Sequence, residues 1–319
     1  PTTGAGMTDQ TLQVVQFVHP GFEYHRQEHV GRRSRHSGVM AWKPGRSAHD
    51  RKFMLNKGSL FDLEAEKDHQ SVPLGFWGEW EGPSVFWKVE SPGKPLPRIL
   101  HAPFRPASHP TEPVQNTDPM VFGDAFIYSN CLQPTYRSLR SLSPGSVVLF
   151  GRYARTDGRP SFSLDTCLVV DRVQTLAPAP LDADSYGMDL LEDAVLCPLH
   201  SEGAEDDLSV YFGRRRSPDV PGPFSFFPAR IMHSSPPLFA RPELHPTGAL
   251  QGVISPGNMQ GIKVAAHLSV TDRDEVWTEV ARQVSQQDCG LGHHAVPPPV
   301  LTLQTAEAAA EDAPIALNM

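Results

Sequence analysis

The sequence predicts an α+β protein that is rich in β-structure. Short apolar runs with many β-branched and aromatic residues recur along the chain, which is typical of strands. The 32 prolines and 25 glycines divide these runs into short strands joined by many loops. Only one long stretch, which begins at Thr271, repeats its apolar residues at helical spacing. The pattern favours a β-rich core followed by a C-terminal helix over a helical bundle.

The expected strands follow one another through most of the chain. They are the apolar runs 12–18, 74–89, 121–131, 146–153, 161–173, 208–213 and 224–231. The expected helix has Val276, Val280 and Val284 on one face, and Thr271 with Asp274 can cap its first turn.

We expect residues 7–175 to form a β-rich core domain. The opening PTTGAG, residues 1–6, is interpreted as a cloning remnant. Residues 188–292 are expected to form a mixed α/β segment packed on the core, after a linker at 176–187. The tail 296–319, with its PPP and AEAAAEDAP runs, is expected to be disordered.

Composition excludes several classes of protein. The net charge of −8 argues against non-specific nucleic-acid binding, although it allows a local basic patch. No apolar run approaches the roughly 18 residues that a membrane span needs, so no membrane partner is expected. The four cysteines form no CxxC pair, which predicts a reducing, cytoplasmic location. The oligomeric state is left open.

Motifs for cofactors and metals are absent from the sequence. It contains no GxGxxG, no Walker-A loop, no HExxH and no GxSxG. We therefore expect no cofactor and no metal, and any catalysis should rest on side chains.

The stretch 115–133 combines acids with aromatic residues. In a strand, Phe122, Asp124, Phe126, Tyr128 and Asn130 would share one face, since side chains alternate. A carboxylate between two aromatic rings suits a pocket, because a buried charge needs a partner. The alternative is a half-solvated face with Asp124 as an ordinary surface acid.

Two further segments place carboxylates beside apolar residues. Glu79 and Glu81 alternate with aromatic residues in 74–89, which would put both acids on one face of a strand. Asp165 interrupts the apolar run 161–173. The alternatives are an exposed strand face for the two glutamates, and a structural acid satisfied by Arg152 or backbone donors for Asp165.

Two arginine-rich loops are candidate phosphate contacts. They are Arg32, Arg33 and Arg35 near the N-terminus, and Arg214, Arg215 and Arg216 between two expected strands. The alternative for both is a solvated loop.

Three phrases carry a resemblance to known proteins. HDRKFMLNKG (49–58), FWGEWEGPS (76–84) and QNTDPMVFGDAFIYSNC (115–131) resemble a family of uncharacterised bacterial and fungal proteins, over roughly residues 12–173. The Pro144-Gly145 turn with its following strands is similar to the small antiparallel barrels of PUA and ASCH modules, which hold RNA or modified bases. The chain also resembles the fungal arginine-containing cyclodipeptide synthases, which use arginyl-tRNA. That last resemblance transfers no catalytic residue.

The first hypothesis is an aminoacyl-tRNA-dependent transferase that forms a peptide bond. Glu79, Glu81, Asp124 and Asp165 would line an acidic, aromatic pocket for a guanidinium or another cation. Glu79 or Asp124 would be the base, and Tyr128 and Asn130 would donate hydrogen bonds to the oxyanion. The expected substrate-binding residues are Trp77, Glu81, Asn116, Asp118, Phe126 and Asp165. Ser129 or Cys131 would serve only a less favoured covalent route.

Two alternatives remain open. A PUA-like barrel core, with aromatic residues stacked on a base, would bind RNA or a modified base without turnover. A scaffold without a site would respond to Glu79→Gln or Asp124→Asn only in its stability.

Overall fold

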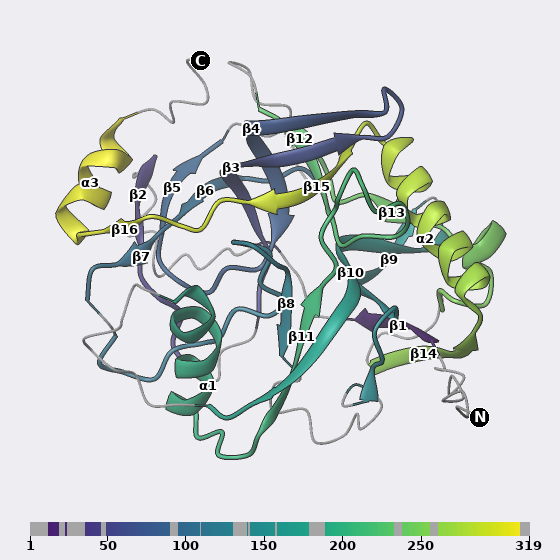
Figure 1. The fold of residues 1–319 in the computed structure, drawn as a ribbon. Coiled ribbons are helices and arrows are strands. Elements are labelled where there is room, and N and C mark those ends of the chain that lie inside the picture. The colour runs from purple at the N-terminus through teal and green to yellow at the C-terminus, as the bar shows by residue number, and fades with distance from the viewer. Residues whose placement is uncertain are drawn as a thin grey trace.

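The strands of the protein form two seven-stranded sheets of mixed direction, as the computed structural model shows (Figure 1). The structure describes residues 12–18, 23, 36–45, 49–89, 95–108, 110–129, 139, 141–156, 158–178, 189–232, 238–255 and 261–312. The α+β class and the predominance of strands are therefore confirmed. The described strands form two large sheets and one two-stranded pair rather than one closed barrel, so the expected PUA-like barrel is not confirmed.

The first sheet has the order β14-β1-β9-β10-β11-β8, and β13 pairs with β10 beside this path. Its strands are β1 (Leu12–Val18), β8 (Ile127–Ser129), β9 (Val147–Thr156), β10 (Arg159–Leu176), β11 (Leu208–Gly213), β13 (Glu243–Leu244) and β14 (Gly261–Leu268). β1 is parallel to β9, and the other pairs are antiparallel.

The second sheet has the order β15-β12-β4-β3-β6-β5-β2, and β15 also pairs with β3. Its strands are β2 (Ser37–Met40), β3 (Lys52–Asp62), β4 (Lys67–Gly78), β5 (Ser84–Lys88), β6 (Ile99–Pro103), β12 (Phe227–Ile231) and β15 (Gly290–Ala295). Two short strands, β7 (Arg105–Pro106) and β16 (Val300–Leu301), pair separately in parallel.

The middle of the first sheet is buried on both faces, which explains the continuous apolar runs in β1, β9 and the centre of β10. In β9, Val148 and Phe150 point into one hydrophobic core, whereas Val147 and Leu149 point into a second. The first core lies against Phe76 and other residues of the second sheet. The second core is completed by a helix.

That helix is α2 (Val270–Ser285), which packs Val276, Val280 and Val284 into the second core. Its first turn is closed by a capping box of Ser269 and Asp272, two positions before the cap of Thr271 and Asp274 that the sequence predicts. Ser269 donates to and accepts from the same aspartate, and so satisfies backbone donors at the helix start.

Shorter helical elements complete the described chain. A π-helical turn η2 (Glu192–Leu196) leads into α1 (Cys197–Ser201), and η3 (Gly248–Leu250) is a 3₁₀ turn. α3 (Leu303–Glu311) lies at the side of the molecule opposite α2 (Figure 1) and buries Ala306 and Ala310 against Val85 and Phe104. The segment expected to be disordered from residue 296 thus contains a strand and a helix.

Strands from both halves of the chain share each sheet. β14 pairs with β1, and β12 and β15 pair with the β3–β4 hairpin. Strands of the segment 188–292 therefore pair directly with strands of residues 7–175 within both sheets. Among the described residues, no helix has the length and apolar character to cross a membrane.

Candidate active site

Buried ion pairs gather where the β3–β4 hairpin meets the loop 115–118. Lys52 is opposite Gly78 in the antiparallel register, so Arg51 and Glu79 emerge side by side from the open end of the hairpin. Glu81 follows two residues later, and His49 precedes Arg51 by two. We call His49, Arg51, Glu79, Glu81 and Asp165 the acid–base cluster.

Arg51 is the centre of this cluster and is fully buried. Its guanidinium donates to Glu79 through Nη1 and to Oδ2 of Asp165 through Nε at 2.9 Å. Burial opposes the charge on Arg51, but the two carboxylates outweigh it and raise the pKa of the guanidinium. Buried ion pairs of this kind are stable only when each charge has a partner of opposite sign.

Asp165 reaches Arg51 because the ladder between β9 and β10 is irregular there. Leu164 pairs with Gly151 and Thr166 with Phe150, so Asp165 is an extra residue in β10. An extra residue of this kind re-aims a side chain. Arg241 lies 3.4 Å from the same carboxylate, so Asp165 is a buried acid paired with two arginines, Arg51 and Arg241.

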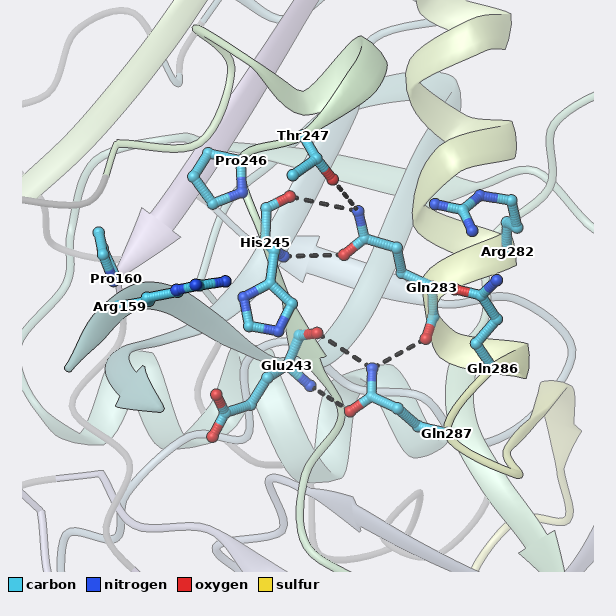
Figure 2. A pocket seen from close by; sticks show the side chains of 10 residues that line it. All are labelled: Arg159, Pro160, Glu243, His245, Pro246, Thr247, Arg282, Gln283, Gln286 and Gln287. Atoms are coloured by element: carbon cyan, nitrogen blue, oxygen red, sulfur yellow. Dashed lines mark hydrogen bonds between the residues drawn. The ribbon is translucent and has the colours of Figure 1, made fainter. Parts of the chain in front are cut away.

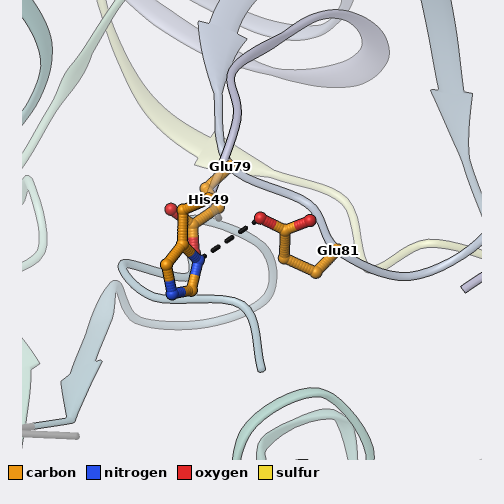
Figure 3. Close-up of side chains that lie close together, drawn as sticks. All are labelled: His49, Glu79 and Glu81. Carbon is orange, nitrogen blue, oxygen red and sulfur yellow. Dashed lines mark ion pairs between the residues drawn. The ribbon is translucent and has the colours of Figure 1, made fainter. Parts of the chain in front are cut away.

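His49 bridges the two glutamates (Figure 3). Its Nδ1 lies 3.1 Å from Oε1 of Glu79 and 3.3 Å from Oε1 of Glu81. Burial disfavours the charged ring, but the Glu79 and Glu81 carboxylates outweigh it and raise the pKa of His49 to about 10. The side chain is 18% exposed, so His49 connects the buried carboxylates with the surface.

Two lysines complete the electrostatics. Lys43 lies 3.4 Å from Oε2 of Glu81 and 2.9 Å from Oδ2 of Asp50. Lys52 donates to the carbonyl of Trp80, and burial lowers its pKa to about 8 despite the nearby Glu81. The carboxylates of the cluster therefore face cations on several sides.

The loop 115–118 is fixed to the cluster through its backbone donors. Gln115 N donates to Lys43 O and Thr117 N to Ala194 O, each at 2.9 Å, and Asp118 N donates to Oε1 of Glu79 at 2.6 Å. Asp118 itself is buried, which raises the pKa of its carboxyl well above the ordinary value, although it accepts hydrogen bonds from Ser129.

The structure brings together only part of the predicted acid set. Glu79, Glu81 and Asp165 meet in the cluster, and Asn116 and Asp118 lie in the adjoining loop. Asp124 does not join them, since its side chain is 89% exposed and lies 3.3 Å from Arg215. The chain bends at Gly123, with φ of +87°, and β8 begins only at Ile127, so the expected alternation does not extend back to Asp124.

The predicted aromatic pocket is likewise not formed by the described residues. Trp77 donates to Phe239 O, Phe126 stacks on Phe227 and Tyr128 packs edge-on against Phe150, all within the cores. The place expected for a substrate guanidinium, between Glu79 and Asp165, is filled by the chain's own Arg51. Asn130, Cys131, Arg32, Arg33 and Arg35 lie outside the described residues.

Ser129 is not available as a nucleophile in this arrangement. It is fully buried, and its hydroxyl donates to Oδ2 of Asp118 at 2.8 Å. The covalent route that the sequence left open therefore has no exposed hydroxyl at this position.

The arginines of the second arginine-rich loop differ in their contacts. Arg216 donates two hydrogen bonds to Asp68, at 2.8 and 2.9 Å, and covers the ring of Phe61 at 3.6 Å. Arg214 is half-buried and Arg215 is exposed. Only these two remain candidates for phosphate contacts in this loop.

The Arg216–Asp68 pair gives a pH-dependent prediction. Arg216→Met is expected to lower stability by about 1 kcal/mol near neutral pH, because it removes a bidentate ion pair. The hydrogen bond from Arg216 lowers the pKa of Asp68 below its ordinary 3.8. The lowered pKa contributes stability above pH 3.8 that is lost as the pH falls through the folded value, so the difference between variant and parent should shrink there. Urea denaturation across pH 3–7 measures it, and a difference that stays constant would contradict the pair.

A polar groove of about 960 Å³ lies elsewhere, between α2 and β13 (Figure 2). Gln283 and Gln287 line this groove, and their side-chain amides form hydrogen bonds with the backbone of Glu243 and His245. These contacts satisfy an edge strand that has few ladder partners. The groove shares no residue with the acid–base cluster, and we read its glutamines as structural.

Sequence reasoning missed His49 and Arg51 as members of the site. Both stand in HDRK directly before the apolar run 53–55, where they look like a solvated basic segment. The available signal was two glutamates on the returning strand of a hairpin, which bury only with cations opposite. His49, Glu79 and Glu81 each offer one ligand atom, and these atoms lie within 4.8 Å of one another.

The arrangement can therefore do two things chemically. Paired carboxylates beside a histidine can exchange protons with a bound group, and the same atoms can hold a cation. Comparison with known proteins found no matching family model, no matching curated protein and no matching solved structure.

Proposed function

We propose that the chain is a transferase that forms a peptide bond from an aminoacyl-tRNA, with the acid–base cluster as its reactive centre. One observation carries the proposal. The three phrases on which the sequence resemblance rests, 49–58, 76–84 and 115–131, supply His49 and Arg51, Glu79 and Glu81, and the loop 115–118, which meet in one place. Buried acids and bases with shifted pKa values are characteristic of functional sites.

The reaction requires the protein to bind the amine, to accept its proton and to stabilise the oxyanion. The amine nitrogen attacks the ester carbonyl, so a C–N bond forms and the C–O bond to the tRNA ribose breaks, while a proton moves from nitrogen to the departing oxygen. The Glu79 and Glu81 carboxylates would attract the ammonium group and accept its proton. The positive charge at His49 would stabilise the oxyanion, since the His49 side chain is more exposed than the Glu79 carboxylate with which it pairs.

Phosphate contacts would come from outside the cluster. Arg214 is half-buried and Arg215 is exposed, and each pairs with an exposed acid, Asp171 and Asp124 respectively. Surface pairs of this kind contribute little stability, so these guanidinium groups can exchange their partners for phosphate at small cost. This supports an RNA partner despite the net charge of −8.

Incubation of the purified chain with individual charged tRNAs tests the proposal. We expect mass spectrometry to detect an arginine-containing cyclic dipeptide with arginyl-tRNA and a second charged tRNA, and no such product with uncharged tRNA. Failure to consume any charged tRNA would overturn the proposal. Tight RNA binding without consumption would replace it with the binding-module alternative.

A further inference from the structure

Three ligand atoms of His49, Glu79 and Glu81 converge on one point (Figure 3). The Nδ1 atom lies 3.1 Å from one Oε1 and 3.3 Å from the other. With metal–ligand bonds of about 2.0–2.2 Å, neighbouring ligand atoms of an octahedral or tetrahedral site lie roughly 2.9–3.5 Å apart. We infer that His49, Glu79 and Glu81 form a binding site for one divalent transition-metal cation.

The second observation is a buried oxygen that accepts no hydrogen bond. Among the described residues, Oε1 of Glu81 has no hydrogen-bond partner, although its side chain is only 1% exposed and its ion pair with His49 spans 3.3 Å. A buried carboxylate oxygen without a hydrogen bond is costly. A cation between the three ligand atoms would satisfy it.

The surrounding charges orient both carboxylates for this purpose. Arg51 holds Oε2 of Glu79, and Lys43 lies near Oε2 of Glu81, so in each acid the other oxygen is the one that turns to His49. The backbone N–H of Asp118 also donates to Oε1 of Glu79 and fixes its position. Hydrogen-bonded ligands of this kind are typical of metal sites.

Gln115 supplies a partner for the far side of the imidazole. Its Nε2 lies 2.8 Å from Nε2 of His49, and its buried Oε1 has no hydrogen-bond partner among the described residues. A half-turn of this amide places Oε1 where it accepts Nε2–H, which satisfies both groups. When a cation displaces the Nδ1 proton, the remaining proton stays on Nε2 and the lone pair of Nδ1 faces the two glutamates, as a metal-ligating histidine requires.

The ligand set selects the class of cation. One imidazole and two carboxylates suit zinc, manganese or iron, whereas magnesium and calcium prefer oxygen ligands alone. Three protein ligands leave a coordination position open, and His49 gives the site its access to solvent. The inference rests on the geometry of the cluster and does not need the transferase reaction.

Calorimetry with Zn²⁺ alone, on chain freed of metal by a chelator, tests the inference without tRNA. We expect one ion per chain, with affinity reduced at least tenfold in Glu81→Gln and about 10- to 100-fold in Gln115→Leu. Mg²⁺ should bind at least tenfold more weakly than Zn²⁺. His293→Gln is the matched control, because His293 lies 3.3 Å from Asp68 outside the cluster, and it should bind Zn²⁺ as the parent does.

Absence of stoichiometric Zn²⁺ binding to the parent chain would overturn the inference, and so would equal binding by the parent and Glu81→Gln. If a variant unfolds, Co²⁺ absorption spectra of the parent decide the question instead. Bands of a nitrogen- and oxygen-ligated ion support the site, and a hexa-aqua spectrum rejects it. A parent that binds Zn²⁺ but forms no dipeptide would reject only the proposed reaction.

Discussion

Replacing Arg51 with methionine is expected to lower the free energy of unfolding by about 3–5 kcal/mol. The guanidinium is fully buried and bonded to both Glu79 and Asp165. Methionine fills similar volume but leaves both carboxylates buried with fewer partners, and each is then unstable as an anion. Urea denaturation monitored by tryptophan fluorescence measures the change.

Arg215→Met is the matched control, because it makes the same chemical change at an exposed ion pair. It should alter stability by no more than about 0.5 kcal/mol. Adding Glu79→Gln and Asp165→Asn to Arg51→Met should restore much of the lost stability, since the uncompensated charges are removed. A loss below about 1 kcal/mol in Arg51→Met alone would show that the cluster is not buried as described.

Replacing Glu79 with glutamine is expected to slow dipeptide formation from charged tRNA by about 10²–10⁴-fold. The variant keeps the shape of the side chain but loses the negative charge beside His49 and Arg51. Neither proton transfer nor the attraction of an ammonium group then remains at this position. Single-turnover assays of product formation measure the rate, and urea denaturation at the assay temperature shows that the variant is folded there.

Asp124→Asn provides the comparison, since the sequence suggested both acids as bases and the structure separates them. Asp124 is almost fully exposed and pairs only with Arg215, so its amide variant should retain the parental rate. A slow Asp124→Asn with a fast Glu79→Gln would reverse the assignment. Equal rates in all three proteins would remove the cluster from the reaction.

Local patterns were sufficient to predict some of the strands and part of the site. The runs 12–18 and 208–213 match β1 and β11 because their composition and length fit buried strands. Glu79 and Glu81 lie on one side of the cluster although β4 ends at Gly78. Neighbours so close in sequence stay close in space whatever the exact backbone.

The rest depended on contacts that no local pattern contains. Asp165 and Arg51 are 114 positions apart, and they meet because one extra residue interrupts the β9–β10 ladder. Asp124 was misplaced for the opposite reason, since a turn at Gly123 ended an alternation that looked continuous in sequence. Charge runs such as HDRK reveal their role only when the opposing strand is known.

The position of β1 has a consequence for synthesis on the ribosome. Leu12–Val18 pairs with β9 on one edge and with β14, at 261–268, on the other. One edge of β1 therefore stays uncovered during synthesis until residues 261–268 have been translated. A product that stops before residue 261 would expose an apolar strand edge, and such edges recruit other chains into aggregates.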